Sequence, residues 1–331
     1  MTVAVIIVNW NGGELLRRCL DALRRQWRSP DHVIVVDNAS TDESLALAER
    51  LLRDVELIRL SSNVGFARAN NIGAQAARRY DALALLNPDA FAEPGWLDAL
   101  VAAAERDSTA AAFASQIRLA TAPEYLDGAG DSYHASGRAW RNGHRTRWAE
   151  WPANDVDVFA ACAAAALYRR EAFDEVHGFD EEFFCYFEDV DLGFRLRLRG
   201  YRCLYVAGAV VQHVSSALRG YRSDFAVYHG ERNAVWTFFK NMPGPLLWLY
   251  LPQHLLLNAA ALMFYPWRGQ GWVVLKAKLD ALRGLPSVLR RRRLVQRERR
   301  IEAWDLRRAL TGGVATPYFD RYSARASLQS L

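Results

Sequence analysis

The sequence has little cysteine and no long apolar segment at its start. Its four cysteines, among 331 residues, are widely scattered, and no two have the two-residue spacing that zinc knuckles and redox motifs require. We therefore expect reduced thiols that are mostly buried. The first apolar run, residues 3–8, is short and lacks a basic leader or a small-residue cleavage site, so we expect no secretion.

Two further signatures are missing. Residues 9–13 read Asn-Trp-Asn-Gly-Gly and lack the three-glycine fingerprint that brings a pyrophosphate close to the first helix of nicotinamide-dependent dehydrogenases. No recognition module accompanies the arginine-rich tail, so we expect no nucleic acid as a partner. These absences argue against an oxidoreductase and against a nucleic-acid-binding protein.

What the chain does contain is ordinary globular composition. Hydrophobic residues make up 51% of the sequence and charged residues 24%, which excludes disorder as the main state. The pI near 9.1 reflects positive charge concentrated in the last third, at Arg290–Arg293 and Arg297–Arg300. An anionic partner is therefore expected mainly at that end.

Strand patterns and helix patterns alternate along the N-terminal part. Short β-branched runs typical of buried parallel strands stand at residues 3–8, 32–37, 56–60 and 82–86. Helical spacing of apolar residues occupies the intervals, at residues 14–26, 44–53 and 67–77. This order predicts an α/β fold with a doubly wound, mostly parallel sheet, whose ligands collect beyond the carboxyl ends of the strands.

The middle of the chain is less regular. Periodicity fades between residues 115 and 157, where we expect a loop region over a site. Regular structure is expected again at residues 158–169, in a helix over 190–199 that pairs Asp191 with Arg195, and in a last strand over 204–211. We therefore predict an α/β domain of residues 1–225, followed by a helical, basic region of residues 226–331.

Residues 245–265 differ in character. Their only strongly polar side chains are Gln253, His254 and Asn258. As a helix, this segment would reach about 30 Å at roughly 1.5 Å per residue, enough to cross a bilayer. Pro252 and the flanking tryptophans at positions 248, 267 and 272 suit a helix in the headgroup boundary at least as well. Interfacial attachment, a single span, and a core or oligomer contact stay open, and the arginine cluster favours anionic lipid or a solvated helix.

Polar side chains gather where the second predicted strand ends. Asp37 is the last residue of that strand and precedes a loop of hydroxyl, amide and carboxylate groups. It is well placed to accept a hydrogen bond from a base or a ribose. Asp42, just before the next helix, is equally suited to cap that helix. We interpret Asp37 as a ligand-binding residue and leave Asp42 open between the two roles.

A second carboxylate, Asp89, is delivered from an apolar strand by a rigid Asn87-Pro88 turn. This places it at the carboxyl edge of the sheet, where a divalent cation that bridges a diphosphate needs oxygen ligands. His213 follows the last predicted strand and would reach the same edge. A lone histidine is usually a core or surface residue, but an imidazole at this edge can complete a metal site. We therefore predict a metal site of Asp89 and His213.

Three acidic residues follow an aromatic cluster, at Glu188, Asp189 and Asp191. Their place at a helix start suits the helix dipole, which explains one of the three without any function. Aromatic walls around a carboxylate raise its basicity and exclude water, as a general base for a hydroxyl group requires. We assign that role to Asp189.

Together these motifs resemble the family 2 glycosyltransferases with the GT-A fold, especially their bacterial rhamnosyltransferase-like branch. The resemblance covers about residues 3–240, and its parts are specific in their order and spacing although each is weak alone. These parts are residues 8–11, 36–42, 63–73, 86–89, 178–181 and 187–192, His213 with Ser216, and Arg232 with Asn233.

The resemblance implies a role for each matching residue. The donor nucleotide would be bound by Val8, Asn9, Asp37, Asn63, Gly65, Asn70 and Asn87. Asp89 corresponds to the last acid of the family's metal-binding motif, Asn87 stands where the first acid usually is, and His213 often joins the metal. Asp189 corresponds to the catalytic base, with Glu188 beside it. Arg232 and Asn233 match a pair that we assign toward the acceptor or a phosphate.

The implied activity is the transfer, with inversion, of a sugar such as rhamnose or another deoxyhexose from a nucleotide-diphosphate donor to a lipid-linked or polysaccharide acceptor. A divalent metal, Mg²⁺ or Mn²⁺, would assist on the cytoplasmic face of the cell membrane, and a homo-oligomer is left open. A sugar nucleotidyltransferase is an alternative, but its usual glycine-rich basic loop is absent. A non-catalytic membrane scaffold is another alternative. The presence of Asp37, Asp89, Asp189 and His213 argues against it.

Overall fold

The computed structural model describes residues 1–51, 55–215 and 223–313, so Ser216 and residues 314–331 lie outside this part. Ten strands form one sheet: β1 (Val3–Asn9), β2 (His32–Asp37), β3 (Val55–Arg59), β4 (Ala82–Leu86), β5 (Ala90–Ala92), β6 (Ala110–Leu119), β7 (Ala122–Ala129), β10 (Val156–Asp157), β11 (Ala165–Arg169) and β12 (Arg202–His213). Their order is β10-β12-β6-β11-β4-β1-β2-β3, with β5 on β12 and β7 on β6. β8 (Asp131–Tyr133) and β9 (Ala139–Arg141) form a separate two-stranded ribbon.

The long strands of the sheet are mostly parallel, as predicted. β1 pairs parallel with β2 and β4, β2 with β3, and β12 with β6, while β11 is antiparallel to its neighbours β4 and β6. β1 is buried at every position, which is why its sequence is a continuous apolar run. In the β1–β2 register Asn9 lies opposite Asp37, so the polar ends of these strands meet at one edge of the sheet.

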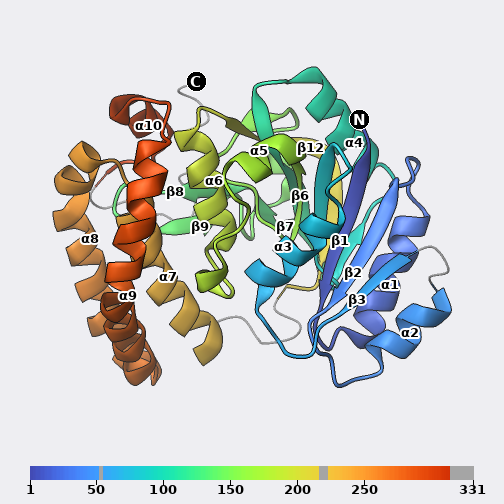
Figure 1. Ribbon diagram of the computed structural model, residues 1–331, viewed down its shortest axis with the longest axis horizontal. Coiled ribbons are helices and arrows are strands. Elements are labelled where there is room, and N and C mark those ends of the chain that lie inside the picture. Colours follow the sequence, from blue (N-terminus) through green and yellow to red (C-terminus); the bar gives the residue numbers. More distant parts are fainter. Residues whose placement is uncertain (52–54, 216–222, 314–331) are drawn as a thin grey trace.

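Helices cover both faces of the sheet (Figure 1). One apolar layer contains Leu16 and Leu20 of α1 (Gly13–Arg24) and Trp96 of α4 (Trp96–Arg106), and α2 (Ser44–Leu51) packs on α1. The other contains Ala67 of α3 (Phe66–Ala76), Phe173 of α5 (Arg170–Glu175) and Leu192 of α6 (Glu188–Leu198). Short 3₁₀ turns are η1 (Trp148–Glu150), η2 (Glu181–Phe183) and η3 (Tyr265–Arg268). This is the doubly wound arrangement that the sequence predicts.

The expectation of a loop between residues 115 and 157 is wrong. This stretch holds the end of β6 and all of β7, β8, β9 and β10. β8 and β9 have three residues each. Glycines with positive φ stand before and between them: Gly130 (70°) precedes β8, and Gly137 (94°) lies between β8 and β9. Strands this short show no period in the sequence. Regular structure was expected over all of residues 158–169, but the strand there, β11, begins only at Ala165.

The C-terminal region is helical, as predicted. Within residues 223–313 it contains α7 (Asp224–Asn241), α8 (Gly244–Phe264), α9 (Gly271–Arg297) and α10 (Ala303–Ala309), which stand together on one side of the molecule (Figure 1). Phe238, Met242 and Leu246 share an apolar core with residues of the preceding domain such as Tyr133 and Phe194. The division at residue 225 stays a prediction, although α7 begins close to it.

Buried charges join α7 to the first domain. The predicted Asp191–Arg195 pair is present, at 2.8 Å within α6. Lys240 of α7, only 2% exposed, lies 2.7 Å from Asp191 and 2.6 Å from Asp180. Burial of so many charges is tolerated because each has an opposite partner. Burial would raise the pKa of Asp180, yet Lys240 and Arg291 hold it below its usual value.

The cysteines are free thiols, as predicted, and three of the four are buried. Burial raises the pKa of Cys203 to about 12 and those of Cys19 and Cys162 further. Protonated, buried thiols are poor nucleophiles and poor metal ligands.

Candidate active site

The ends of β1 and β2 form the first polar corner of the site. The Asn9 amide donates to Asp37 Oδ1 (2.9 Å) and to Ser40 Oγ (3.0 Å), while the Ser40 backbone N–H donates to Asp37 Oδ2 (3.1 Å). Asn9 and Asp37 are 0% and 2% exposed, and Asn9 Oδ1 is buried without a partner among the described residues. Asp42 accepts from the Ser44 backbone N–H (3.1 Å) at the start of α2, which is the capping contact left open above.

The loop before α3 lies beside this corner. Asn63 Oδ1 accepts from the Asn38 amide (3.0 Å) and from the Gly65 backbone N–H (3.0 Å), so it ties the loop to the end of β2. Gly65 has φ 86° and ψ 165°, and a Cβ there would lie 2.5 Å from the Phe184 ring. Only glycine allows this close approach. Asn70 is buried and donates to Phe66 O (3.0 Å) within α3.

Asp89 and His213 meet, as their predicted role requires. The Asn87-Pro88 turn leads from β4 to Asp89, and the Asn87 backbone N–H bonds Ala164 O (2.8 Å). His213 is the last residue of β12, and its Nε2 lies 3.2 Å from Asp89 Oδ1. Both residues are buried, with His213 3% and Asp89 6% exposed. One nitrogen and one oxygen thus face each other at the carboxyl edge of the sheet.

Asp127 on β7 completes this cluster, and the sequence analysis missed it. Its Oδ2 lies 2.8 Å from His213 Nδ1 and 2.6 Å from Arg141 Nη1, and its Oδ1 accepts from Ser215 Oγ (3.2 Å). The Asp127 carboxylate is fully buried. Its only signal in the sequence is an acid before a glycine pair, Gly128 and Gly130, inside the stretch expected to be a loop.

The electrostatics of this cluster favour a positive charge between the carboxylates. Burial would lower the pKa of His213, but Asp127 and Asp89 raise it to about 9. Burial would raise the pKa of Asp127, but Arg141, His144 and His213 hold it far below its usual value. A carboxylate on the outer nitrogen of a histidine is also the usual way to orient an imidazole toward a metal. The residues present therefore fit a divalent cation.

Asp189 is half-buried at the start of α6. Its Oδ2 accepts from the Ala163 backbone N–H (3.0 Å) and its Oδ1 from that of Val190 (2.8 Å). Against these bonds, burial raises the pKa of Asp189 above its usual value, as a general base requires. A ligand atom of Asp189 lies within 4.8 Å of those of Asp131 and Cys162.

Glu188, grouped with Asp189 in the sequence analysis, points into the interior. It is 5% exposed, and its Oε2 is buried without a partner among the described residues. Burial and the charge of Asp189 raise the pKa of Glu188 well above its usual value. A carboxyl group in this state is held neutral rather than as a second base.

The loop before Asp189 is held by the pair on α7. Asn233 is fully buried and donates to Phe183 O (3.0 Å), Cys185 O (3.0 Å) and Tyr186 O (2.7 Å). Arg232 donates to Phe183 O (3.0 Å). These bonds hold a backbone in which Phe184, Tyr186 and Phe187 all have positive φ. The assignment of Arg232 and Asn233 toward the acceptor or a phosphate stays a prediction, and in this structure Asn233 and Arg232 Nη2 bind loop carbonyls.

Arg141 links the two halves of the site. It shares Asp127 Oδ2 with His213 and interacts electrostatically with Asp131 and Asp189. Asp89, His213 and Asp189 therefore belong to one continuous polar cluster at the carboxyl edge of the sheet. Neither Asp131 nor Arg141 was singled out from the sequence.

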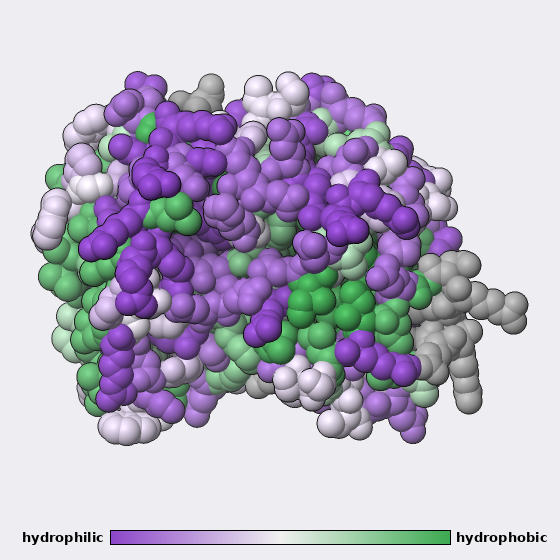
Figure 2. All heavy atoms as spheres, in the orientation of Figure 1, coloured by the Kyte–Doolittle hydropathy of each residue, from purple (hydrophilic) through white to green (hydrophobic). Residues whose placement is uncertain are grey.

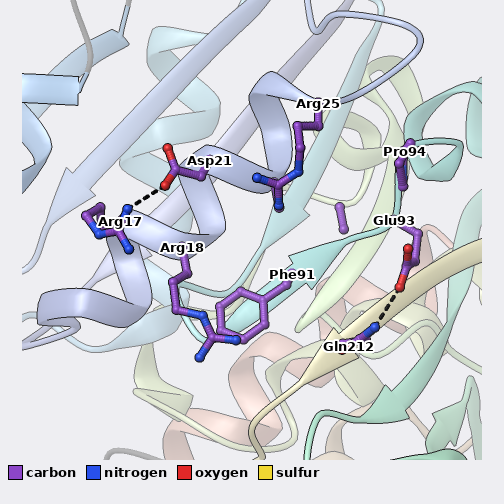
Figure 3. A pocket seen from close by; sticks show the side chains of 10 residues that line it. Arg17, Arg18, Asp21, Arg25, Phe91, Glu93, Pro94 and Gln212 are labelled. Carbon is purple, nitrogen blue, oxygen red and sulfur yellow. Dashed lines mark hydrogen bonds and ion pairs between the residues drawn. The ribbon is translucent and has the colours of Figure 1, made fainter.

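A separate surface hollow of about 450 Å³ lies between α1, β5 and β12 (Figure 3). Several of its polar groups are already engaged: Arg17 binds Asp21, Arg18 stacks on the Phe91 ring at 4.1 Å, and Gln212 donates to Glu93 (2.7 Å). None of the residues of the polar cluster lines it. This hollow is not the site that the sequence predicts.

Comparison with known proteins identifies the family. Residues 4–177, more than half of the chain, match the family described as Glycosyl transferase family 2. The chain belongs to this family. This glycosyltransferase is 30% identical over 290 residues to the N-acetylglucosaminyl-diphospho-decaprenol L-rhamnosyltransferase of Mycobacterium tuberculosis. The match covers 77% of this chain and 93% of that protein. It is rhamnosyltransferase-like, as the resemblance implied.

Two other relatives of this glycosyltransferase have names that refer to O-antigen synthesis. The O-antigen biosynthesis protein RfbC of Myxococcus xanthus is 30% identical over 92% of the chain, which spans 24% of that protein. The O-antigen chain rhamnosyltransferase RfbN of Salmonella typhimurium is 26% identical over 64% of the chain and 66% of its own length.

Solved structures show that this glycosyltransferase has the GT-A fold. The mannosyltransferase PcManGT from Pyrobaculum calidifontis, solved with GDP-Man and Mn²⁺, has a TM-score of 0.56 at 18% identity and covers 85% of this chain and 86% of its own. GalNAc-T7, solved with UDP, GalNAc and Mn²⁺, has a TM-score of 0.61 at 19% identity, and the match covers 77% of this chain and 49% of the GalNAc-T7 chain.

Proposed function

We propose that this glycosyltransferase transfers a deoxyhexose such as rhamnose, with inversion, from a nucleotide-diphosphate donor to a lipid-linked glycan during cell-surface glycan synthesis. The names of two relatives specify rhamnose, and one of them specifies a diphospho-decaprenol acceptor. The observation that carries the proposal is the continuous cluster of Asp89, His213, Asp127, Arg141 and Asp189. Asp89 and His213 would hold the cation, and Asp189 would supply the basic carboxylate that a displacement at one carbon needs.

Asp89 and His213 are the residues that would hold Mg²⁺ or Mn²⁺. Asp127 on His213 Nδ1 fixes the ring so that Nε2 faces Asp89. When bound, the metal neutralises the negative charge that builds on the departing diphosphate. Two protein ligands are few, but magnesium commonly keeps several waters and binds substrate phosphates.

Asp189 would act as the base for the incoming hydroxyl. Its raised pKa gives it basicity, and the backbone bonds from Ala163 and Val190 fix its position. A well-placed base contributes about a hundred- to ten-thousandfold to the rate. The donor nucleotide would lie against Val8, the Asn9–Asp37 corner and the Asn63–Gly65 loop, where Asn9 Oδ1 is a buried acceptor that still lacks a partner among the described residues.

The enzyme would work on the cytoplasmic face of the membrane, attached through α8 and α9. α8 has no charged residue, and it is the helix of the described chain that is long and apolar enough to cross a bilayer. Its outward side chains are exposed, among them Trp248 (72%) and Met263 (71%), and Figure 2 shows hydrophobic residues gathered along this edge. An exposed apolar surface of this kind marks an interaction site.

A position in the interface fits better than a span. His254, midway along α8, is buried, donates from Nδ1 to Ser136 O (2.7 Å) and stacks on the Phe238 ring at 4.0 Å. One side of α8 thus rests on the folded protein, which leaves the other side for lipid headgroups and upper acyl chains. On the exposed face of α9, leucines give way to Arg290, Arg293 and Arg297, which suit anionic lipid. Arg292 faces inward instead, toward Phe239 O.

A donor screen tests the proposed function. The purified enzyme is incubated with dTDP-, UDP- and GDP-sugars, a lipid-diphosphate acceptor and Mg²⁺ or Mn²⁺, and the released nucleotide and product anomer are identified. We expect nucleoside diphosphate from a deoxyhexose donor, an inverted linkage, and loss of transfer in chelator that either metal restores. Pyrophosphate release would instead indicate a nucleotidyltransferase, and absence of any nucleotide binding would indicate a scaffold.

A further inference from the structure

Arg141 interacts with residues of both halves of the site. It ends β9, and in the ribbon register it lies directly opposite Asp131 of β8. Paired residues in an antiparallel ribbon place their side chains on the same face. Gly128 makes room for the arginine stem, since a Cβ there would lie 3.3 Å from both Cβ and Cδ of Arg141.

The guanidinium is anchored at one corner only. Nη1 donates to Asp127 Oδ2 at 2.6 Å, and within the described chain Nε and Nη2 have no hydrogen-bond partner. The side chain is 35% exposed, whereas Asp127 is fully buried and the His213 side chain is 4% exposed. A buried carboxylate therefore aims an arginine whose remaining donors stay open to a ligand.

The charges around Arg141 are mostly negative. Asp127, Asp131 and Asp189 surround it, and burial, which would lower the pKa of Arg141, is outweighed by these groups and Cys162, which raise it. Planar guanidinium groups with two open donors match phosphate oxygens in pairs. A bound diphosphate would be repelled by the acids alone, so it needs a fixed cation on this side of the site.

We propose that Arg141 is a phosphate-binding residue for the donor, with its Nε and Nη2 donating to oxygens of the nucleoside diphosphate. This inference rests on the proposed function. In the transfer, the bond from the sugar C1 to the phosphate oxygen breaks and its electron pair stays on the diphosphate. The acceptor oxygen forms the new bond to C1, and its proton passes to Asp189. Arg141 stabilises the charge gained by the departing diphosphate.

The donor, rather than the acceptor, is the source that the contacts favour. Arg141 shares one carboxylate oxygen with His213, the residue assigned to the metal that accompanies the donor. Its neighbour Asp131 extends toward Asp189, where the acceptor hydroxyl is expected. Arg141 thus contacts a partner of the assigned metal ligand and stands opposite a neighbour of the assigned base, which suits the phosphate that leaves the sugar.

Calorimetric titration of nucleoside diphosphate, nucleoside monophosphate and nucleoside tests the assignment on Arg141→Gln and Arg141→Lys. Titrations run in chelator and in Mg²⁺, so that the arginine is measured with and without metal. We expect Arg141→Gln to bind the diphosphate about 10- to 100-fold more weakly in both buffers while nucleoside binding is unchanged, and Arg141→Lys to lose less. Arg106→Gln, which breaks an exposed pair with Asp155, is the control.

Three outcomes would decide against the proposal. Unchanged diphosphate affinity in Arg141→Gln would remove the arginine from the donor site. A raised acceptor KM with unchanged diphosphate affinity would assign it to the acceptor's phosphates. Equal loss of nucleoside binding would show a general collapse of the pocket, which circular dichroism and the Arg141→Lys variant check independently. Failure of the wild type to bind any nucleotide would instead overturn the proposed function.

Discussion

At the scale of single residues, Asp189 is distinguished from the other acids by its environment. Glu188 beside it is buried without a partner for one oxygen, and Asp191 is neutralised by Lys240 and Arg195. Asp189 is the one of these three that is only half-buried, and backbone N–H groups of Ala163 and Val190 hold its carboxylate. Sequence spacing could not separate them, because all three suit a helix start equally.

Asp189→Asn is expected to lower kcat by about a hundred- to ten-thousandfold, since an amide cannot take the proton of the acceptor hydroxyl. Nucleoside diphosphate affinity should be retained. Because burial raises the pKa of Asp189, the rate of the wild type should rise with pH through a value above the ordinary 3.8. A transfer assay over pH measures both effects.

The control for this substitution is Asp98→Asn, an exposed acid in the first turn of α4. It changes the same charge and should leave kcat unaltered. Turnover of Asp189→Asn close to that of the wild type would eliminate Asp189 as the base, whatever the pH profile shows.

Asp127→Asn tests the orientation of His213 without relying on catalysis. Loss of the carboxylate at Nδ1 weakens both the basicity and the alignment of the ring, and such changes typically cost 10–100-fold in metal affinity. We therefore expect Mn²⁺ to bind about 10–100-fold more weakly, measured by the electron paramagnetic resonance signal of free Mn²⁺. Asp107→Asn, which loses a similar contact with Arg202 (2.9 Å), is the matched control. Equal Mn²⁺ affinity in both variants would contradict the role of Asp127.

At the scale of elements, the strands that carry the site differ in how visible they are in the sequence. β1, β2 and β4 were predicted within one residue, because each is a nearly continuous apolar run buried on both faces. Asp37 and Asp89 follow directly from them. β8 and β9 have only three residues each, Gly128 interrupts β7, and all three strands show little alternation of apolar and polar residues. For that reason Asp127, Asp131 and Arg141 escaped prediction.

The aromatic loop before α6 is a second feature that spacing alone could not reveal. Its conformation depends on a contact across the site, where Gly65 lies against Phe184, and on Asn233 from a helix that follows much later in the chain. The sequence shows both residues, and the resemblance implied a ligand role for each. The structure shows that they shape the loop that delivers Asp189.

Gly65→Ala should therefore damage the site through the loop. A Cβ would lie 2.5 Å from the Phe184 ring and 2.6 Å from its carbonyl, and φ 86° with ψ 165° is a conformation essentially reserved for glycine. We expect a loss of about 1–3 kcal/mol in the free energy of unfolding, and a lower kcat. Denaturant unfolding and a transfer assay measure these.

Gly230→Ala provides the contrast. Gly230 lies within α7, and a Cβ there would meet no atom within 4 Å. Alanine should stabilise the helix by roughly 0.5–1 kcal/mol and leave activity unaltered. If Gly65→Ala were as stable and as active as Gly230→Ala, the close approach of the two loops would not matter for the enzyme.

At the scale of the whole molecule, the apolar surface and the catalytic cluster are joined through one core. α8 rests on Phe238 of α7, and α7 carries the Arg232–Asn233 pair that holds the loop before Asp189. Tyr133 of the β8 strand, which also bears Asp131, packs in the same core. A membrane bound by α8 and α9 would thus hold the site at a defined height, suited to an acceptor anchored in lipid.

Membrane attachment through α8 and α9 predicts that substitutions on these helices, but not elsewhere on the surface, weaken binding to vesicles. The double variant Trp267→Ser with Trp272→Ser removes two side chains that are 90% and 73% exposed at the α8–α9 turn. Sedimentation with phosphatidylglycerol vesicles should fall by at least about tenfold, because each ring buried in the interface contributes apolar area. Binding of the wild type should also weaken with salt, since the exposed Arg290, Arg293 and Arg297 would face anionic headgroups.

Trp27→Ser is the control, since Trp27 is 80% exposed but lies next to Gly95, away from these helices. If both variants sediment like the wild type, α8 and α9 are not the membrane-binding surface. Alkaline carbonate extraction then distinguishes an interfacial helix from a span. An interfacial α8, held on one side by His254 and Phe238, should be released with the soluble fraction, whereas a spanning helix would stay in the pellet because its backbone bonds are satisfied within the bilayer.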